Sequence, residues 1–196
     1  MKELNNPNPI HLRIISVWLL LVWILSAINP FDRSDWLLEN LLVFFFSILL
    51  ITTYSRFRFS NTSYWLYALF MTLHLIGAHY TYAEAPIGFW FQDWFSLERN
   101  HYDRVVHFLF GLLLAWSFRE LLTHYVTASR RWINALSLCI VLALSALYEL
   151  VEMLAALVVA PDVGIAFLGT QGDVWDAQKD TGLAFTGAIL AILVKR

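Results

Sequence analysis

Long uncharged blocks of apolar residues alternate with short polar segments along the chain. Such blocks predict membrane-spanning helices, because a helix rises about 1.5 Å per residue and roughly 17 residues cross a hydrocarbon core of about 30 Å. The pattern predicts an all-α fold, a polytopic membrane protein with a bundle of about six transmembrane helices. The predicted spans lie at about residues 12–28, 37–53, 64–82, 104–124, 132–159 and 176–194.

Short connections join the predicted spans, and the chain carries no low-complexity linker and no clear internal repeat. We therefore expect residues 1–196 to form a single transmembrane domain. The composition agrees, since 59% of the residues are hydrophobic and 14% are charged, against about 25% charged residues in soluble domains. A net charge of −2 offers no basic surface for nucleic acid. The expected environment is the lipid bilayer.

Lysine and arginine residues gather on alternate connections, and this bias sets the expected orientation. Eight of them fall on one side of the membrane, whereas the connections on the other side hold Arg33 and Arg99. Because cytoplasmic connections are enriched in positive charge, we expect both termini in the cytoplasm. The eight residues are Lys2, Arg13, Arg56, Arg58, Arg130, Arg131, Lys195 and Arg196.

The connection between the third and fourth predicted spans, residues 83–100, is rich in aromatic residues. Its segment FWFQDWF, Phe89–Phe95, places five aromatic rings in seven positions. Two interpretations stay open. The segment lies flat in the non-cytoplasmic interface of the membrane, or it re-enters the membrane as a lid over a site, where protein or water has to satisfy its backbone.

Acidic and histidine side chains of several spans reach the same expected depth near the non-cytoplasmic side. The fourth span begins on that side, and Asp103 and His107 stand four residues apart on one face of its first turn. The fifth span ends there. Glu149 follows Trp132 by 17 residues, about 25 Å at helical rise, and Glu152 lies one turn further along.

The stretch GDVWDAQKD, Gly172–Asp180, opens the sixth span and carries the densest acidic pattern. Asp173, Asp176 and Asp180 are spaced i, i+3 and i+7, so they follow one face of a helix. His79 of the third span falls in the same half of the membrane. Separate spans thus bring carboxylates and imidazoles to one level, which predicts a shared polar site.

Six carboxylates share this level with two cations, Arg104 and Lys179. An ionised side chain within the membrane costs about 2.5–3.5 kcal/mol, so the excess charge has to be protonated, hydrated or neutralised by bound cations. We expect a divalent metal ion. Oxygen ligands suit Mg²⁺, Ca²⁺ or Mn²⁺, and histidine also admits Zn²⁺ or Fe²⁺. The expected metal-binding residues are Asp173, Asp176, Asp180, Glu149 and His79.

Simpler interpretations of single residues stay open at this point. Asp173 has the position of a helix cap, and Lys179 has the reach to neutralise a carboxylate of the fifth span as a structural pair. His74, on an otherwise apolar span, is typical of a hydrogen bond between helices. Asp32 and Asp35 have the position of a solvated helix flank.

The chain contains three characteristic motifs: NHYDRVVHF at Asn100–Phe108, YELVEM at Tyr148–Met153 and GTQGDVWDAQKD at Gly169–Asp180. Their combination resembles the YjdF-like bacterial inner-membrane family, over nearly the whole chain. The resemblance implies a multi-pass protein of the bacterial inner membrane. This is a domain-of-unknown-function family, so the resemblance brings signature positions without assigned roles. They are Asp103, His107, Glu149, Glu152, Asp173, Asp176 and Asp180.

Three functions fit these patterns. The first is a metal-dependent membrane enzyme, a hydrolase or transferase that acts on a lipid or envelope precursor at the periplasmic face. Its catalytic residues would be His107, oriented by Asp103 as a general base, and Glu152. The second is a cation or proton carrier that uses the same acids, and the third is a structural or assembly protein. We prefer the first, because a carrier usually shows inverted repeats and the acids outnumber their cation partners.

Overall fold

The computed structural model describes residues 5–194, and this part of the chain is entirely helical and irregular, with no strand. Helices of 18 to 27 residues make up most of it, and two shorter helices lie in the connections. The eight described helices are α1 (Pro9–Ser26), α2 (Arg33–Thr53), α3 (Asn61–Tyr80), α4 (Pro86–Phe95), α5 (Tyr102–Tyr125), α6 (Arg130–Ala156), α7 (Pro161–Leu168) and α8 (Asp176–Val194).

Local sequence signals explain where several helices begin and end. Asn8 accepts a hydrogen bond from a backbone N–H of the first turn of α1, and Pro9 occupies the first helical position, where no N–H is needed. Asp32 and Ser60 cap α2 and α3 in the same way. α3 stops at Thr81, whose φ of 54° is left-handed and incompatible with a continuing helix.

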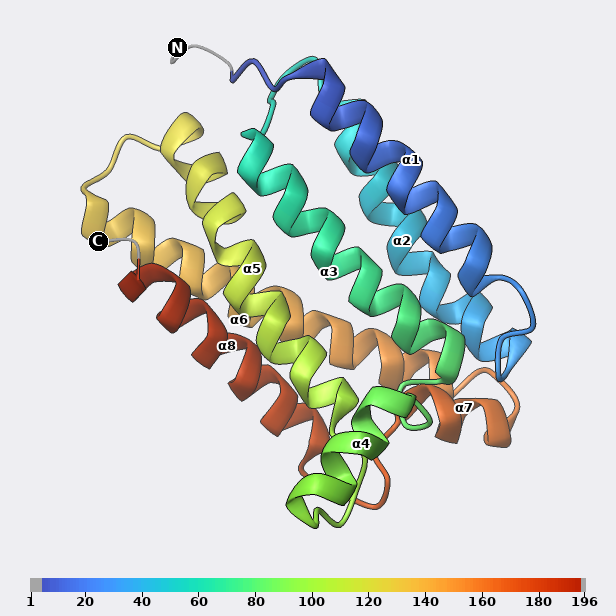
Figure 1. The fold of residues 1–196 in the computed structure, drawn as a ribbon. Helices are drawn as coiled ribbons and strands as arrows, with labels where there is room; N and C mark the ends of the chain where they lie inside the picture. Colours follow the sequence, from blue (N-terminus) through green and yellow to red (C-terminus); the bar gives the residue numbers. More distant parts are fainter. Residues whose placement is uncertain (1–4, 195–196) are drawn as a thin grey trace.

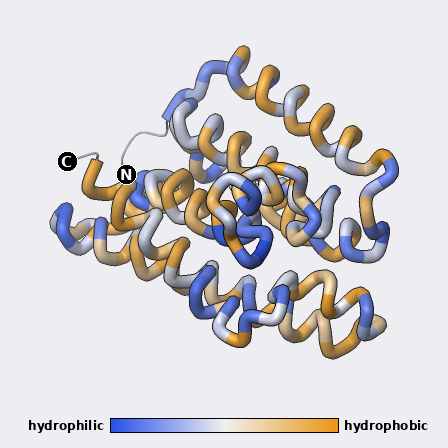
Figure 2. Tube along the Cα trace, turned by 60° about the horizontal axis from the view of Figure 1, so that its bottom comes forward, coloured by the Kyte–Doolittle hydropathy of each residue, from blue (hydrophilic) through white to orange (hydrophobic). Residues whose placement is uncertain are grey.

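Four helices, α1, α2, α5 and α6, are long and apolar enough to cross a membrane. This finding confirms an all-α membrane protein with several spans. α3 and α8 have 20 and 19 residues. Within the described residues, these two helices are not among those that are both long and apolar enough to cross a membrane. Figure 2 shows apolar positions along the long helices and hydrophilic positions in the connections. Six crossing helices therefore stay a prediction.

Helix α5 is the centre of the arrangement. It packs against α3 on one side and against α6 and α8 on the other, while α1 and α2 cover α3. α4 and α7 lie at the end of the bundle where α8 begins (Figure 1), which we call the α4–α7 end. The sequence pattern did not predict α7, which lies between the fifth and sixth predicted spans and packs against α2 and α6.

Two glycines allow α5 and α8 to touch backbone to backbone. A Cβ on Gly111 would lie 1.7 Å from the carbonyl oxygen of Ala184, and one on Gly187 would lie 2.1 Å from that of Phe108. Both helices start at the α4–α7 end (Figure 1). Asp103 precedes Gly111 by about eight residues, and Asp180 precedes Gly187 by about seven, so helical rise brings both carboxylates to one level.

We predict that Gly187→Ala destabilises the protein, because a methyl group has no room between α5 and α8 and overpacking costs about 1–3 kcal/mol. Gly182→Ala on the same helix is the matched control, since a Cβ there meets nothing within 4 Å. It should be neutral or stabilising, because alanine favours a helix over glycine by about 1 kcal/mol. Thermal unfolding in mild detergent measures both. Equal midpoints for the two variants would contradict the close contact.

Candidate functional site

Two connections that are distant in sequence meet at the α4–α7 end. The side chain of Gln171 accepts a hydrogen bond from the backbone N–H of Asn100 at 3.0 Å and donates one to its carbonyl oxygen at 2.8 Å. The neighbouring Arg99 donates to the carbonyl oxygen of Thr170 at 2.9 Å. These contacts hold Arg99 above the first turn of α8.

Arg99 forms a forked ion pair with Asp176, the first residue of α8. Its Nη1 lies 2.5 Å from Oδ1 of Asp176 and its Nη2 lies 3.4 Å from Oδ2, a geometry that suits guanidinium and carboxylate. Arg104 adds a second contact to Asp176 at 3.2 Å. Asp176 is 4% exposed. The sequence pattern placed Arg99 in a connection, directly before the NHYDRVVHF motif, and did not assign it to the site.

Asp173 precedes α8 and is held by several donors. Nζ of Lys179 lies 2.6 Å from its Oδ2, the N–H of Trp175 donates to its Oδ1 at 3.0 Å, and Arg104 also donates to it. These bonds, led by the one from Lys179, hold the pKa of Asp173 below its usual range. Asp173 is therefore ionised at neutral pH and already neutralised by protein cations. Lys179 pairs here rather than with the acids of α6.

Asp103, Asp176 and Asp180 form a carboxylate triplet between α5 and α8. Each offers an oxygen that lies within 4.8 Å of those of the other two. Asp180 is 1% exposed, and its Oδ1 has no hydrogen-bond partner within residues 5–194. A buried carboxylate oxygen without a partner is costly. The triplet thus has the spacing and the free oxygen that a cation site needs.

His107 connects the triplet to α6. Its Nε2 lies 3.5 Å from Oδ1 of Asp103 and 3.4 Å from Oε1 of Glu149, and its Nδ1 lies 3.3 Å from Oγ of Ser145. The ring is 8% exposed. One nitrogen thus faces two carboxylates while the other is fixed by a hydroxyl group, an arrangement that orients an imidazole.

Glu149 and Glu152 extend the acidic cluster along α6. Their carboxyl groups are one helical turn apart and close enough to interact electrostatically. Glu152 is 8% exposed. The structure therefore brings together the predicted residues of α5, α6 and α8 at one level.

His79 lies apart from this cluster by its described contacts. Its Nδ1 lies 3.0 Å from the carbonyl oxygen of Ser26, the last residue of α1, and its ring packs edge-on against Tyr80. The cation-site group found among the described residues does not include it. His79 ties α3 to α1, which are neighbours in the bundle.

A second buried polar group on α2 was not anticipated. The prediction of a solvated flank is wrong for Asp35, which is 1% exposed and has no hydrogen-bond partner for either carboxylate oxygen within residues 5–194. One turn further, Glu39 accepts from the hydroxyl of Tyr148 at 2.7 Å, and its carbonyl oxygen lies 3.1 Å from Nε2 of His74. The expected interhelical hydrogen bond of His74 is thus present. The spacing of Asp35 and Glu39, four residues apart next to an apolar block, was the sequence signal for this buried group.

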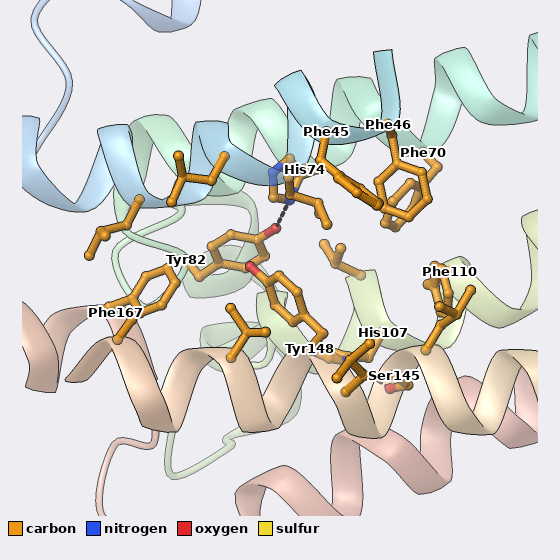
Figure 3. Close-up of a pocket in the computed structure, with 18 residues that line it drawn as sticks. Phe45, Phe46, Phe70, His74, Tyr82, His107, Phe110, Ser145, Tyr148 and Phe167 are labelled. Atoms are coloured by element: carbon orange, nitrogen blue, oxygen red, sulfur yellow. Dashed lines mark hydrogen bonds between the residues drawn. The ribbon is translucent and has the colours of Figure 1, made fainter. Parts of the chain in front are cut away.

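An apolar cavity of about 360 Å³ lies beside His107, between α2, α3, α5 and α6. Figure 3 shows phenylalanine rings on its walls, with Tyr82 hydrogen-bonded to His74 and Tyr148 reaching in from α6. His107 and Ser145 form part of the wall. The same imidazole therefore borders the carboxylates and the cavity.

Removal of the Arg99 guanidinium group should destabilise the fold. We predict that Arg99→Met lowers the free energy of unfolding by about 3 kcal/mol, because it leaves Asp176 in a buried position without its main partner. Lys179→Met is the control, since that side chain is half exposed and exposed pairs contribute little. Chemical unfolding in mild detergent measures both. A parent-like Arg99→Met protein would show that the fork carries no stability.

Comparison with known proteins confirms the resemblance found in the motifs. The family model described as "Predicted membrane protein (DUF2238)" matches residues 11–196. The Inner membrane protein YjdF of Escherichia coli (strain K12) is 38% identical over 188 residues, which cover 95% of this chain and 89% of that protein. No solved structure gives a significant match. The chain belongs to the DUF2238 family of predicted membrane proteins.

Proposed function

We propose that this protein is a metal-dependent membrane enzyme, a hydrolase or transferase that acts on a lipid or envelope precursor at the periplasmic face of the inner membrane. One observation carries the proposal: the carboxylates of Asp103, Asp176 and Asp180 lie together, and the buried Oδ1 of Asp180 has no hydrogen-bond partner within residues 5–194. A bound cation would remove the penalty of burying these carboxylates. It would also polarise an ester or phosphoryl oxygen of a substrate.

The donor set favours a divalent ion. Asp103, Asp176 and Asp180 offer oxygen ligands, which suit Mg²⁺ or Mn²⁺, and the neighbouring Glu149 and His107 widen the choice to Zn²⁺ or Fe²⁺. The proposal leaves out two residues expected from the sequence. Asp173 lies outside the carboxylate triplet, with its oxygens bound by protein donors, and His79 is bonded to the end of α1.

His107 is the proposed general base. With its Nε2 hydrogen directed at Asp103 and Glu149, its Nδ1 carries the lone pair and lies 3.3 Å from Ser145 Oγ at the cavity wall. In this tautomer Nδ1 accepts a proton from water or from an attacking hydroxyl. Glu152, one turn from Glu149 on α6 and 8% exposed, adds a buried carboxyl group beside the base.

The packing below the acids favours an enzyme over a carrier. Ala184 and Ala188 follow Asp180 by one and two turns, and with Ala115 and Val141 they form a fully buried apolar cluster between α5, α6 and α8. An ion path through the bundle would need polar groups at this depth. A purely structural role is also disfavoured, because structural acids would be paired and Asp180 has an unpaired oxygen.

The proposed topology has six spans in one domain, with both termini in the cytoplasm. α3 and α8 are long enough to cross the membrane, about 30 and 28 Å at helical rise. The arginines predicted to be cytoplasmic that the structure describes lie near the ends of α1, α2 and α6 that are opposite α4 and α7 (Figure 1). The remaining basic residues of that prediction, Lys2, Lys195 and Arg196, lie outside the described residues. On α4, Trp90 and Trp94 are 60% and 75% exposed, which supports an interfacial helix rather than a closed lid.

Reporter fusions test this topology. Green fluorescent protein fused to the C-terminus should fluoresce, and alkaline phosphatase at the same position should be inactive, because the positive-inside bias places that end in the cytoplasm. Alkaline phosphatase fused after residue 97, in the connection that follows α4, should be active. The reverse pattern would overturn the orientation and with it the periplasmic site.

Metal binding tests the site itself. We predict that detergent-purified parent protein binds Mn²⁺ with a stoichiometry near one, read as loss of the free-ion electron paramagnetic resonance signal. Asp103→Asn and Asp180→Asn should each weaken binding by about tenfold or more, because each removes a charged oxygen ligand. Asp93→Asn is the control, an exposed acid on α4, and should bind like the parent.

The same preparations, placed in nanodiscs of bacterial inner-membrane lipid extract with Mn²⁺, address the reaction. Mass spectrometry of the lipids should show one species consumed by the parent and left intact by His107→Gln. Unchanged Mn²⁺ signal with folded parent protein would end the metal form of the proposal, and no altered lipid would end the enzymatic one.

A further inference from the structure

The walls of the cavity beside His107 offer no free hydrogen-bond partner to a water molecule. Its polar wall groups already have partners: the hydroxyl of Tyr82 lies 2.6 Å from Nδ1 of His74, that of Tyr148 donates to Glu39, and Ser145 lies against His107. Water or a polar ligand in such a space would lack hydrogen-bond partners, so the space suits an apolar occupant. Its volume of about 360 Å³ is in the range of ligand pockets.

The cavity opens sideways, through the surface that faces the hydrocarbon core. Four of its wall residues are also strongly exposed: Leu41 and Phe45 of α2 are 63% and 61% exposed, and Leu147 and Val151 of α6 are 54% and 48% exposed. α2 packs against α3 and α7, and α6 against α5, α7 and α8, so the mouth lies between α2 and α6. α2 and α6 are long and apolar enough to cross the membrane, so a mouth between them faces lipid.

The inner end of the cavity reaches the candidate reaction centre. Val106, 4% exposed, and His107 are adjacent wall residues on α5. Nε2 of His107 faces Asp103 and Glu149. A lipid whose chain fills the cavity and whose polar end points to the α4–α7 end therefore has that polar end next to these groups.

We infer that the cavity binds a single aliphatic chain, acyl or prenyl, of a membrane lipid that enters between α2 and α6 and presents its polar end at His107. This inference rests on the proposed function and names the class of its substrate. The chain would replace bilayer hydrocarbon contacts with contacts to Phe70, Phe110 and neighbouring leucines. The selection is for an unbranched or methyl-branched chain, because the wall presents no free polar group to a functionalised one.

A photoreactive lipid tests the inference without metal or turnover. The parent protein is placed in nanodiscs of phosphatidylethanolamine and phosphatidylglycerol that contain trace phospholipids with a diazirine at different positions along one chain. After irradiation, peptides are mapped by mass spectrometry. We expect labels on Phe70 and Val106, which are 5% and 4% exposed and out of reach of bulk lipid. Labels confined to outward-facing residues would overturn the inference.

Two substitutions on α6 sharpen the result. Ala155→Trp fills part of the cavity and should reduce labelling of Phe70 and Val106 by about tenfold, because the ring takes the volume of the chain. Ala143→Trp is the matched control, since Ala143 is exposed and outside the cavity wall, and should label like the parent. Equal labelling in both variants would show that the chain lies elsewhere. If Ala155→Trp does not fold, labelling of the parent still decides.

Competition identifies the source of the chain. Unlabelled polyprenyl phosphate that suppresses the deep labels more strongly than diacyl phospholipid assigns a prenyl chain, and the opposite order assigns an acyl chain. Labelling of Phe70 and Val106 in a protein that binds no Mn²⁺ would support the lipid-chain cavity and contradict the metal-dependent enzyme. Mn²⁺ binding without these labels would contradict the lipid-chain cavity and support the metal site.

Discussion

Carboxylates held inside an apolar bundle are the constraint on which this structure depends. The protein resolves part of it with its own cations: Arg99 and Arg104 contact Asp176, and Arg104 and Lys179 contact Asp173. These pairs lie at the rim, where the cation side chains can reach from connections and helix ends. Deeper acids, of which Asp180 is the clearest, have no such partner within residues 5–194. The depth of an acid thus decides whether a cation of the protein reaches it.

Close approach of α5 and α8 gives the acids their geometry. Without side chains at Gly111 and Gly187 the two backbones meet, and carboxylates on both helices fall within a few ångströms of each other. Between α2 and α6, by contrast, the bundle leaves an apolar cavity. His107 lies between the carboxylates at the α5–α8 contact and the apolar cavity. The surroundings of its ring are therefore polar on one side and apolar on the other.

Helical rise explains what could be predicted from the sequence. Counting residues along a span gives the level of a side chain, and Asp103, Glu149 and Asp180 do lie in one cluster. Counting does not give the direction in which a side chain points around the helix axis. His79 shares the level but contacts the end of α1, and Asp35 turns into the bundle instead of outward.

Connections were harder to predict than spans, because their conformation depends on partners distant in sequence. Arg99 belongs to the site only through the meeting of two connections, which is fixed by Gln171 and Asn100. Nothing in the local pattern around Arg99 specifies that meeting. The helix α7 was missed for a related reason, since its short apolar run is stabilised by packing against α2 and α6.

The forked pair between Arg99 and Asp176 has a consequence for biogenesis. The two residues are separated by 77 positions, and synthesis proceeds from the N-terminus. The guanidinium groups of Arg99 and Arg104 are therefore made and delivered to the membrane long before their carboxylate partners emerge from the ribosome. Until the last helix inserts, Arg99 and Arg104 lack Asp173 and Asp176 as partners, and arrival of α8 completes these ion pairs as well as the packing of the bundle.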